Sequence, residues 1–278
     1  MNILVTGSAG MIGSYVVKGL IEKGHTVLGV DRRVSDARID GLKEVVLDLG
    51  SKEDLMKVFE EHKIDRVIHL AALAHTKGVA DTSWEAFKKV NVDCAVNLFE
   101  ACAKHNVPVL FISTVDAIGM VKGPITPDKE LNPISNYGKS KAMAEGRLKE
   151  ICSQWNIYRF SPVYTEDVKR DIQKRYYLKY PDWAYLIGGG QQFEVLNVRK
   201  AVLAMVDWVD KPVDNTIHII KDEELLDSAK VIAAEKAEGR SKHVVRLPRW
   251  MVVCGYYCIK LLLPKPPNPP ILCIILFI

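Results

Sequence analysis

Short apolar runs alternate with longer stretches in which apolar residues recur every three to four positions through the first 112 residues. Strand patterns that alternate with helix patterns predict an α/β fold built on a parallel sheet. The second half is less regular, and we predict a helix over 137–155, a strand over 157–160 and a short helix over 199–209. In the first half the predicted strands are 3–6, 26–30, 44–47, 66–70 and 109–113, and the predicted helices are 12–23, 51–62 and 83–105.

Charge is unevenly divided between the body of the chain and its end. The 278 residues carry 38 basic and 34 acidic side chains, a net charge of +4. No acid follows Glu238, whereas six of the 38 basic residues do, which leaves residues 1–238 with 32 basic against 34 acidic residues. A surplus this small does not indicate a nucleic-acid partner.

The segment 239–278 combines basic, apolar and proline-rich stretches. Four basic residues precede the apolar stretch 250–263, and a run of prolines separates it from the apolar end 271–278. Basic residues beside an aromatic and aliphatic helix are typical of an interfacial membrane helix. A helix packed on the rest of the protein, with the basic stretch solvated, is the alternative interpretation.

Cysteine spacing and the chain start bear on the compartment. The six cysteines form no C-x-x-C pair, which predicts reduced thiols and a cytoplasmic protein, with membrane association only through 239–278. Cys254 and Cys258 share a helical face without a His or acid partner, so we expect no metal site. We find neither a signal peptide nor the roughly 18 continuous apolar residues of a spanning helix.

A glycine-rich turn, Gly7-Ser-Ala-Gly10-Met-Ile-Gly13, follows the first predicted strand and opens the first predicted helix. Gly7 permits a tight turn, Gly10 lets the backbone approach a diphosphate, and Gly13 lets helix and strand pack closely. Asp31 ends the next strand, where an acid binds an adenosine ribose and repels a 2′-phosphate, which favours NAD. Arg32 and Arg33 follow and leave NADP open. A glycine turn that merely joins strand to helix is the other interpretation.

Tyr137 and Lys141 lie four residues apart in a predicted helix, so both face the same way. An ammonium group beside a phenol stabilises the phenolate and lowers the pKa of the tyrosine toward the working pH. Thr114 follows the strand 109–113, where its hydroxyl can hydrogen-bond the same substrate oxygen. A chance surface pair is the alternative interpretation of this spacing.

Further motifs continue this series along the chain, which runs Gly7-x-x-Gly10-x-x-Gly13, Asp31, Asp48, His69-Leu-Ala-Ala72, Val90-Asn91-Val92, Ser113-Thr114, Tyr137-x-x-x-Lys141 and Arg159. The order resembles the extended short-chain dehydrogenase/reductase superfamily, specifically its NAD-dependent epimerase/dehydratase branch, over roughly residues 1–210. The resemblance implies a Rossmann-type doubly wound parallel sheet with a small C-terminal substrate-binding part. We therefore expect an NAD-binding domain over 1–160, a substrate-binding part over 161–238 that shares some of its core, and the tail 239–278.

The resemblance also implies roles for single residues. Tyr137 would be the general base, Lys141 would bind the nicotinamide ribose and lower the pKa of the tyrosine, and Thr114 would orient the reacting hydroxyl. The residues expected to contact NAD are Gly7, Gly10, Met11, Ile12, Gly13, Asp31, Arg32, Asp48, Leu49, Leu70, Ala71, Ala72, Asn91, Tyr137 and Lys141.

Some positions depart from the family pattern. Pro162 stands where the family has an asparagine that hydrogen-bonds a nucleotide sugar, and it offers no donor. Val115 replaces an acid of the sugar-nucleotide dehydratases, so dehydration loses support, although Asp116 remains as a candidate substrate contact. Arg199 is a candidate for substrate phosphate, with a solvated basic turn as its alternative.

Together these patterns predict an NAD-dependent epimerase that acts on a nucleotide sugar by transient hydride transfer with a tyrosine base. An NAD(P)-dependent reductase or dehydrogenase of a non-nucleotide carbonyl or alcohol is the nearest alternative, because of Pro162. A dinucleotide-binding protein without turnover is the third. The sequence leaves a homodimer open.

Overall fold

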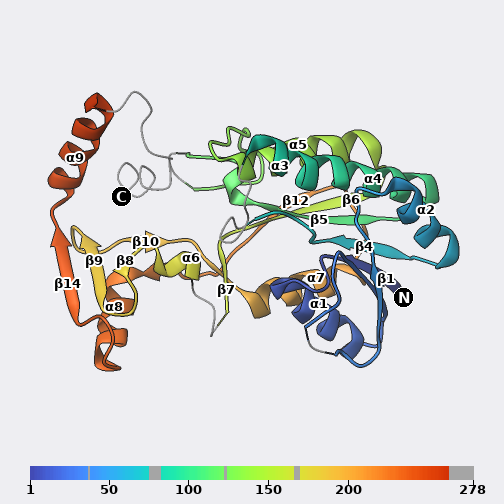
Figure 1. Cartoon of the computed structure of the whole chain (residues 1–278), viewed down its shortest axis with the longest axis horizontal. Helices are drawn as coiled ribbons and strands as arrows, with labels where there is room; N and C mark the ends of the chain where they lie inside the picture. The colour runs from blue at the N-terminus through green and yellow to red at the C-terminus, as the bar shows by residue number, and fades with distance from the viewer. Residues whose placement is uncertain (37, 75–82, 122–123, 166–169, 263–278) are drawn as a thin grey trace. The chain divides into compact units, whose positions relative to one another are not determined.

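The computed structural model describes residues 1–36, 38–74, 83–121, 124–165 and 170–262. Contacts between residues divide the chain into two units, which Figure 1 draws as ribbons. The first unit holds Met1–Ser161 and Val198–Ile220, and the second holds Pro162–Asn197 and the residues from Lys221 onward. The three-part division drawn from the sequence stays a prediction.

A parallel sheet of seven strands forms the centre of the first unit within the described residues. The strands are β1 (Asn2–Thr6), β2 (Thr26–Asp31), β3 (Leu42–Val46), β4 (Arg66–His69), β5 (Val109–Thr114), β6 (Trp155–Phe160) and β12 (Ile217–Ile220). Their order, β3-β2-β1-β4-β5-β6 with β12 beyond β6, contains the doubly wound Rossmann order, and the predicted α/β fold class is confirmed. The order reverses between β1 and β4, where α/β proteins open a ligand crevice at the carboxyl edge.

Helices cover both faces of this sheet. Figure 1 shows α3, α4 and α5 over one face and α1 and α7 over the other. Their bounds, with those of the short π-helix η1 and the 3₁₀ turn η2, are α1 (Met11–Glu22), α2 (Lys52–Glu61), α3 (Trp84–Lys88), η1 (Lys89–Asp93), α4 (Cys94–His105), η2 (Val115–Ala117), α5 (Asn136–Ile151) and α7 (Val198–Trp208). Because both faces are covered, β1 is apolar on both, and Ile3, Leu4 and Val5 are at most 1% exposed.

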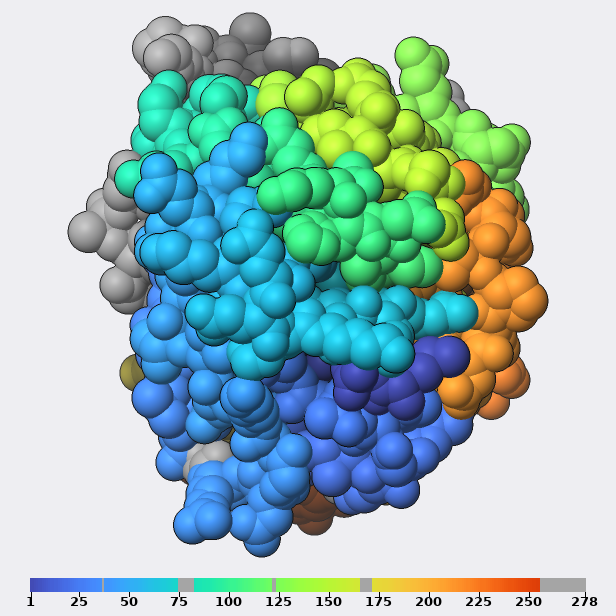
Figure 2. Space-filling model, turned by 90° about the vertical axis from the view of Figure 1, so that its right-hand side faces the viewer, coloured from blue at the N-terminus to red at the C-terminus, as the bar shows by residue number. Residues whose placement is uncertain are grey.

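α2 and α4 pack side by side, and Figure 2 shows their side chains as one continuous surface. Lys52 and Glu100 form an ion pair of 2.6 Å across this contact. Both side chains are more than a third exposed, so the pair stabilises the fold by less than about 1 kcal/mol. Leu55, Leu98 and Phe99 beneath it are fully buried, and their burial provides most of the stabilisation.

Two helices differ from their predicted bounds by more than one residue at an end. The helix predicted over 83–105 is interrupted by the short π-helix η1, in which Asn91 and Val92 are buried at 1% and 4% exposure. The helix predicted over 137–155 ends at Ile151, because Trp155 already begins β6. Short π-helical segments inside α-helices are frequent at functional sites.

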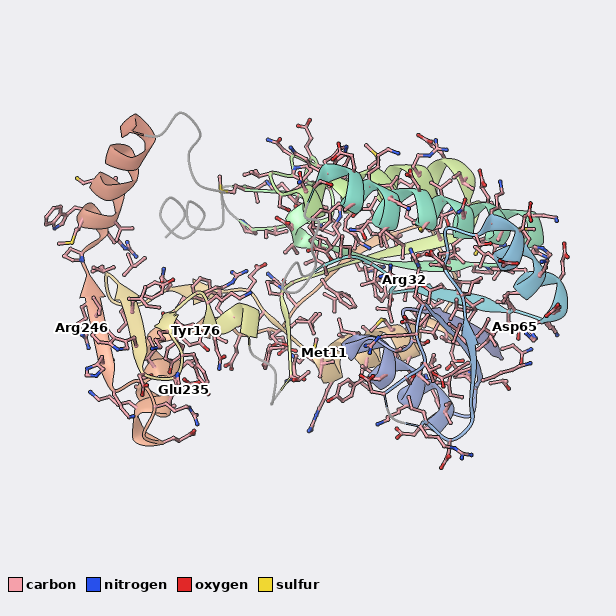
Figure 3. All side chains as sticks on the ribbon, in the orientation of Figure 1. Met11, Arg32, Asp65, Tyr176, Glu235 and Arg246 are labelled. Carbon is pink, nitrogen blue, oxygen red and sulfur yellow. The ribbon has the colours of Figure 1, made fainter. Side chains whose placement is uncertain are left out.

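The second unit is built from short strands and three helices among its described residues. Its core surrounds Tyr176, Leu186 and Ile232. Figure 3 labels Tyr176 and, on α8, Glu235, whose carboxylate accepts the hydroxyl proton of the neighbouring Tyr177. The elements are β7 (Val163–Tyr164), paired with β11 (Leu196–Asn197), β10 (Gln192–Phe193), paired with β13 (Leu226–Asp227), and a sheet of β8 (Tyr177–Lys179), β9 (Trp183–Ile187) and β14 (His243–Leu247), with the helices α6 (Arg170–Gln173), α8 (Ser228–Ala237) and α9 (Arg249–Leu262).

The basic residues before α9 are partly neutralised. Arg240 pairs with Glu238, and Lys242 pairs with Asp182 at 3.0 Å. Trp250, at the start of α9, is 66% exposed. Of the helices in the described ranges, none has the length and apolar character needed to cross a bilayer. Contact of the tail with a membrane surface stays a prediction.

Candidate functional site

The glycine-rich turn between β1 and α1 has the geometry of an anion cradle. Gly7 has a φ of +74°, in the left-handed region that favours glycine. A Cβ atom on Gly13 would lie 2.1 Å from the carbonyl oxygen of Gly7, so close packing here requires glycine. Gly10 caps α1 without a side-chain hydrogen bond. No side chain caps the first N–H groups of the helix, at Met11 and Ile12, so these groups can bind an anion.

Two side chains from the end of β2 hold this turn. Asp31 accepts the N–H of Ala9 at 3.1 Å, and Arg33 donates to the carbonyl oxygen of Ala9 at 3.0 Å. Figure 3 labels Met11 and Arg32 at the carboxyl edge of the sheet, where β1 and β2 end. The structure thus brings Asp31 to the glycine-rich turn together with Arg33, which is not among the residues predicted to contact NAD.

The chain after β4 passes directly beside the turn. The N–H of Leu70 donates to the carbonyl oxygen of Thr6 at 3.2 Å, and the N–H of Ala71 donates to the Thr6 hydroxyl at 3.3 Å. A Cβ atom on Gly7 would lie 2.8 Å from the nitrogen of Ala71. Leu70 and Ala71 of the predicted segment therefore lie beside the glycine-rich turn, where the strand order reverses.

Asp48 and Leu49 take part in local structure after β3. Asp48 accepts the N–H of Gly50 at 2.8 Å, and the carbonyl oxygen of Leu49 accepts the amide of Asn97 at 2.9 Å. Burial and then Asp48 raise the pKa of the Cys94 thiol, while Arg32 lowers it. Arg32 and Asp48 therefore both lie near the Cys94 thiol, beyond the ends of β2 and β3.

α5 carries the Tyr137–Lys141 pair beside the end of β5. Ser135 caps this helix by accepting the N–H of Gly138 at 2.8 Å. A Cβ atom on Gly138 would lie 2.4 Å from the carbonyl oxygen of Asp116, so glycine lets the helix approach η2 closely. The Lys141 side chain is buried, and its Nζ lies 4.0 Å from the centre of the Phe111 ring, a cation–π contact.

The ionisation of this pair differs from the sequence prediction. Burial, and then the negative charge of Asp116, raise the pKa of Tyr137 well above its usual value. Burial lowers the pKa of Lys141 to about 7, against the opposing effect of Glu145. The predicted lowering of the tyrosine pKa is therefore wrong for these residues, because desolvation and the charge of Asp116 raise it.

Thr114 ends β5, and Asp116 lies in the turn η2 that follows. The Thr114 hydroxyl accepts the N–H of Asp116 at 3.2 Å. A hydroxyl that accepts in this way keeps its own proton to donate, so Thr114 can donate to a substrate oxygen. The Asp116 carboxylate accepts the hydroxyl proton of Ser135. Asp116 is thereby fixed at the start of α5, beside Tyr137.

Asn91 serves the structure of the site. Its amide oxygen accepts the N–H of Leu73 at 2.7 Å. Its amide nitrogen donates to the carbonyl oxygen of Leu73 at 3.0 Å and to the Ser140 hydroxyl at 2.9 Å, and that hydroxyl donates to the carbonyl oxygen of Tyr137. Both amide protons are therefore used in joining the segment after β4 to α5, and a contact of Asn91 with NAD stays a prediction.

Arg199 lies in the first turn of α7. α7 packs on α1, where a Cβ atom on Gly19 would lie 3.2 Å from the Val206 side chain. Lys23, just after α1, pairs with Asp207 near the end of α7 at 3.2 Å. The two helices therefore run in the same direction. Arg199 lies at the end of this helix pair that carries the glycine-rich turn.

Sequence reasoning missed two residues that organise the site. Ser135 is a residue type preferred at N-caps and stands two residues before Tyr137, so the sequence could have predicted the helix start there. Glu145 continues the four-residue spacing of Tyr137 and Lys141, and it is fully buried. Within the described part of the chain, no group of three or more His, Cys, Asp or Glu residues could hold a metal ion.

Comparison with known proteins agrees with this geometry. The family model described as NAD dependent epimerase/dehydratase matches residues 3–206, and the chain belongs to this family. The UDP-glucose 4-epimerase of Dictyostelium discoideum is 33% identical over 183 residues, which cover 58% of this chain and 52% of that protein. The chain spans about half the length of the curated relatives it matches.

Solved structures resemble nearly the whole chain. The UDP-glucose 4-epimerase of Thermotoga maritima, solved with UDP-glucose, has a TM-score of 0.73 at 28% identity, covering 89% of this chain and 86% of its own. MoeE5, solved with UDP-glucuronic acid and NAD, has a TM-score of 0.73 at 25% identity, covering 88% and 85%.

Proposed function

We propose that this chain is an NAD-dependent enzyme that epimerises a nucleotide sugar, with Tyr137 as its general base. The observation that carries the proposal is the meeting of two features at one sheet edge. These are the glycine-rich cradle and the Thr114, Tyr137 and Lys141 side chains. The family match and the UDP-sugar epimerases among its relatives support the nucleotide-sugar class, and an NAD-bound structural relative supports the cofactor.

The residues of the cradle fit NAD. The helix N-terminus after Gly10 would bind the diphosphate, and Asp31 at the end of β2 would bind the adenosine ribose. NAD supplies a hydride acceptor that can return the hydride to the opposite face of the sugar. Lys141 would hold the nicotinamide ribose from α5.

Proton transfer falls to the residues at the end of β5 and the start of α5. Tyr137 takes the proton of the reacting hydroxyl and later returns it. Thr114 donates its free hydroxyl proton to the same substrate oxygen. Burial and Asp116 raise the pKa of the phenol, so the phenolate that accepts this proton forms only at higher pH.

A reductase or dehydrogenase of a non-nucleotide carbonyl or alcohol is the second candidate. Pro162 favours it, because its nitrogen has no proton to donate, while its carbonyl oxygen accepts the N–H of Leu196 at 3.0 Å. An epimerase converts one sugar into another with no net change in nicotinamide absorbance. A dehydrogenase changes that absorbance in proportion to its product.

The substitution Tyr137→Phe tests the proposed base. We expect turnover of UDP-glucose and UDP-galactose to fall by about 10²- to 10⁴-fold, because general acid–base catalysis contributes about this much. NAD content of the purified protein should stay the same. Tyr158→Phe is the matched control, since Tyr158 is a tyrosine of the first unit that the proposed site does not use. Wild-type activity in Tyr137→Phe would contradict the assignment.

A further inference from the structure

A buried cluster lies one helical turn beyond Lys141. Glu145 on α5 and Arg159 on β6 are 0% and 2% exposed. Arg159 donates from Nε to one carboxylate oxygen of Glu145 at 3.0 Å and from Nη2 to the other at 2.7 Å. Ser113, near the end of β5, donates its hydroxyl to Glu145 at 2.5 Å. The carboxylate thus joins α5 to two neighbouring strands.

This cluster constrains the helix tightly. Two parallel hydrogen bonds between a guanidinium and a carboxylate fix direction as well as distance. Arg159 uses Nη1 for the carbonyl oxygen of Pro127 at 2.9 Å, so its own position is also fixed. Buried charges are tolerated only when such partners satisfy them. The rotation of α5 about its axis is therefore set at Glu145.

The reacting groups stand directly beside these anchors. Tyr137, Lys141 and Glu145 recur every four residues along one face of α5. Ser113 immediately precedes Thr114 on β5. We propose that Glu145, held by Arg159 and Ser113, is a positioning residue that sets where the Lys141 ammonium and the Thr114 hydroxyl stand at the cofactor. The proposal rests on the proposed function, in which Lys141 binds NAD.

The charged neighbours of Lys141 provide a second readout. Glu145 raises the pKa of Lys141, which burial lowers to about 7. His69 on β4 stays neutral, because burial and then Lys141 lower its pKa to about 3. Tyr137 stays a neutral phenol, and Arg159 is paired with Glu145. Removing the carboxylate therefore lowers the pKa of Lys141 further, and its positive charge is lost at a lower pH.

The double substitution Glu145→Gln with Arg159→Met tests the proposal without leaving one charge buried alone. Glu235→Gln is the matched control, because Glu235 is a 5% exposed carboxylate of the second unit that accepts a tyrosine hydroxyl. NAD binding to each full chain, freed of nucleotide, is titrated calorimetrically over pH values from about 5 to 9, around the pKa of Lys141. Thermal unfolding is recorded separately.

We expect the double variant to bind NAD at least about 10-fold more weakly than wild type at neutral pH. The pH midpoint of binding should move to lower pH, and Glu235→Gln should change neither value. A purely structural role would lower the unfolding temperature and leave the pH midpoint in place. A folded double variant with wild-type affinity and midpoint would overturn the proposal.

Two further variants separate the ways this can fail. Ser113→Ala keeps the ion pair and should shift NAD binding in the same direction by less, and it carries the test if the double variant does not fold. An unchanged Ser113→Ala would then count against the proposal. Lys141→Met examines the proposed function itself: if it binds NAD as wild type does, the role of Lys141 is wrong. If only Lys141→Met weakens binding, positioning by Glu145 is wrong and the function stands.

Discussion

Asp116 sets the pH at which Tyr137 can accept a proton. Its carboxylate is held by Ser135 at the start of α5 and raises the pKa of the phenol. In Asp116→Asn this negative charge is gone, so the pKa of Tyr137 falls. We expect the acidic limb of the kcat profile to move to lower pH, as measured by initial rates of sugar interconversion. Asp128→Asn, at an exposed carboxylate, is the control.

If the acidic limb of the kcat profile lay at the same pH in Asp116→Asn and Asp128→Asn, Asp116 would not control the pKa of Tyr137. The position of Asp116 also shows what the sequence lacked. The Tyr137–Lys141 spacing gave the right face of the helix, but it predicted a lowered tyrosine pKa. That sign depends on burial and on Asp116, which lies 21 residues earlier and meets Tyr137 only through the fold.

At the scale of elements, the contact between β1 and α1 depends on one glycine. A Cβ atom in Gly13→Ala would lie 2.1 Å from the carbonyl oxygen of Gly7, so the turn must open. We expect NAD retention to fall sharply and the free energy of unfolding to decrease by about 1–3 kcal/mol, as overpacking typically does. Nucleotide release on denaturation and urea unfolding measure both effects.

Gly146→Ala provides the matched control on α5. No atom lies within 4 Å of a Cβ atom placed there, and the backbone is helical. This substitution should leave NAD retention unchanged and stabilise the protein by about 0.5–1 kcal/mol. If Gly13→Ala behaved in the same way, the close packing of turn and helix would not matter for the cofactor.

The sequence predicted the elements whose pattern is local and long. β1, β2 and β5 carry nearly continuous apolar runs, so their positions followed from the sequence pattern. The short π-helix η1 was missed, because it depends on the hydrogen bonds of Asn91 with Leu73 and Ser140. β12 and the sheet of β8, β9 and β14 were missed as well, since their segments are short and find their partners only in the fold.

At the scale of the whole molecule, acid stability depends on buried neutral groups. His69 is 1% exposed, between Thr6 and the Phe111 ring, and burial lowers its pKa to about 3. The unfolded chain binds this proton near pH 6.5 and the folded chain does not, so stability falls as the pH drops from about 6.5 toward 3. At about 1.4 kcal/mol per pKa unit the loss reaches at most about 4–5 kcal/mol.

Urea unfolding of wild type and His69→Asn at a series of pH values measures this contribution. The variant should lose less stability on acidification than wild type, whereas His62→Asn, at a partly exposed position, should follow wild type. Parallel stability curves for wild type and His69→Asn would contradict the assigned pKa. The comparison cancels the contribution of His25, whose pKa is also lowered by burial.

The candidate site was predicted best where backbone geometry alone defines it. The glycines of the turn, Asp31 and the Tyr137–Lys141 pair all lie at the carboxyl edge of the sheet, as their positions after strands require. Glu145 and Arg33 act through contacts between distant elements, which the one-dimensional pattern does not contain. The second unit was predicted least, because its short strands carry little periodicity.

The central claim is that this chain epimerises a nucleotide sugar by removing a hydride and returning it within the same molecule. Its most direct test is incubation of the purified full chain with UDP-glucose in heavy water, without added cofactor, followed by mass spectrometry of the sugars. We expect UDP-galactose without deuterium on carbon from wild type, and about 10²- to 10⁴-fold slower formation of UDP-galactose by Tyr137→Phe. Carbon-bound deuterium in the product, or no interconversion of any UDP-sugar by protein that retains NAD, would contradict it.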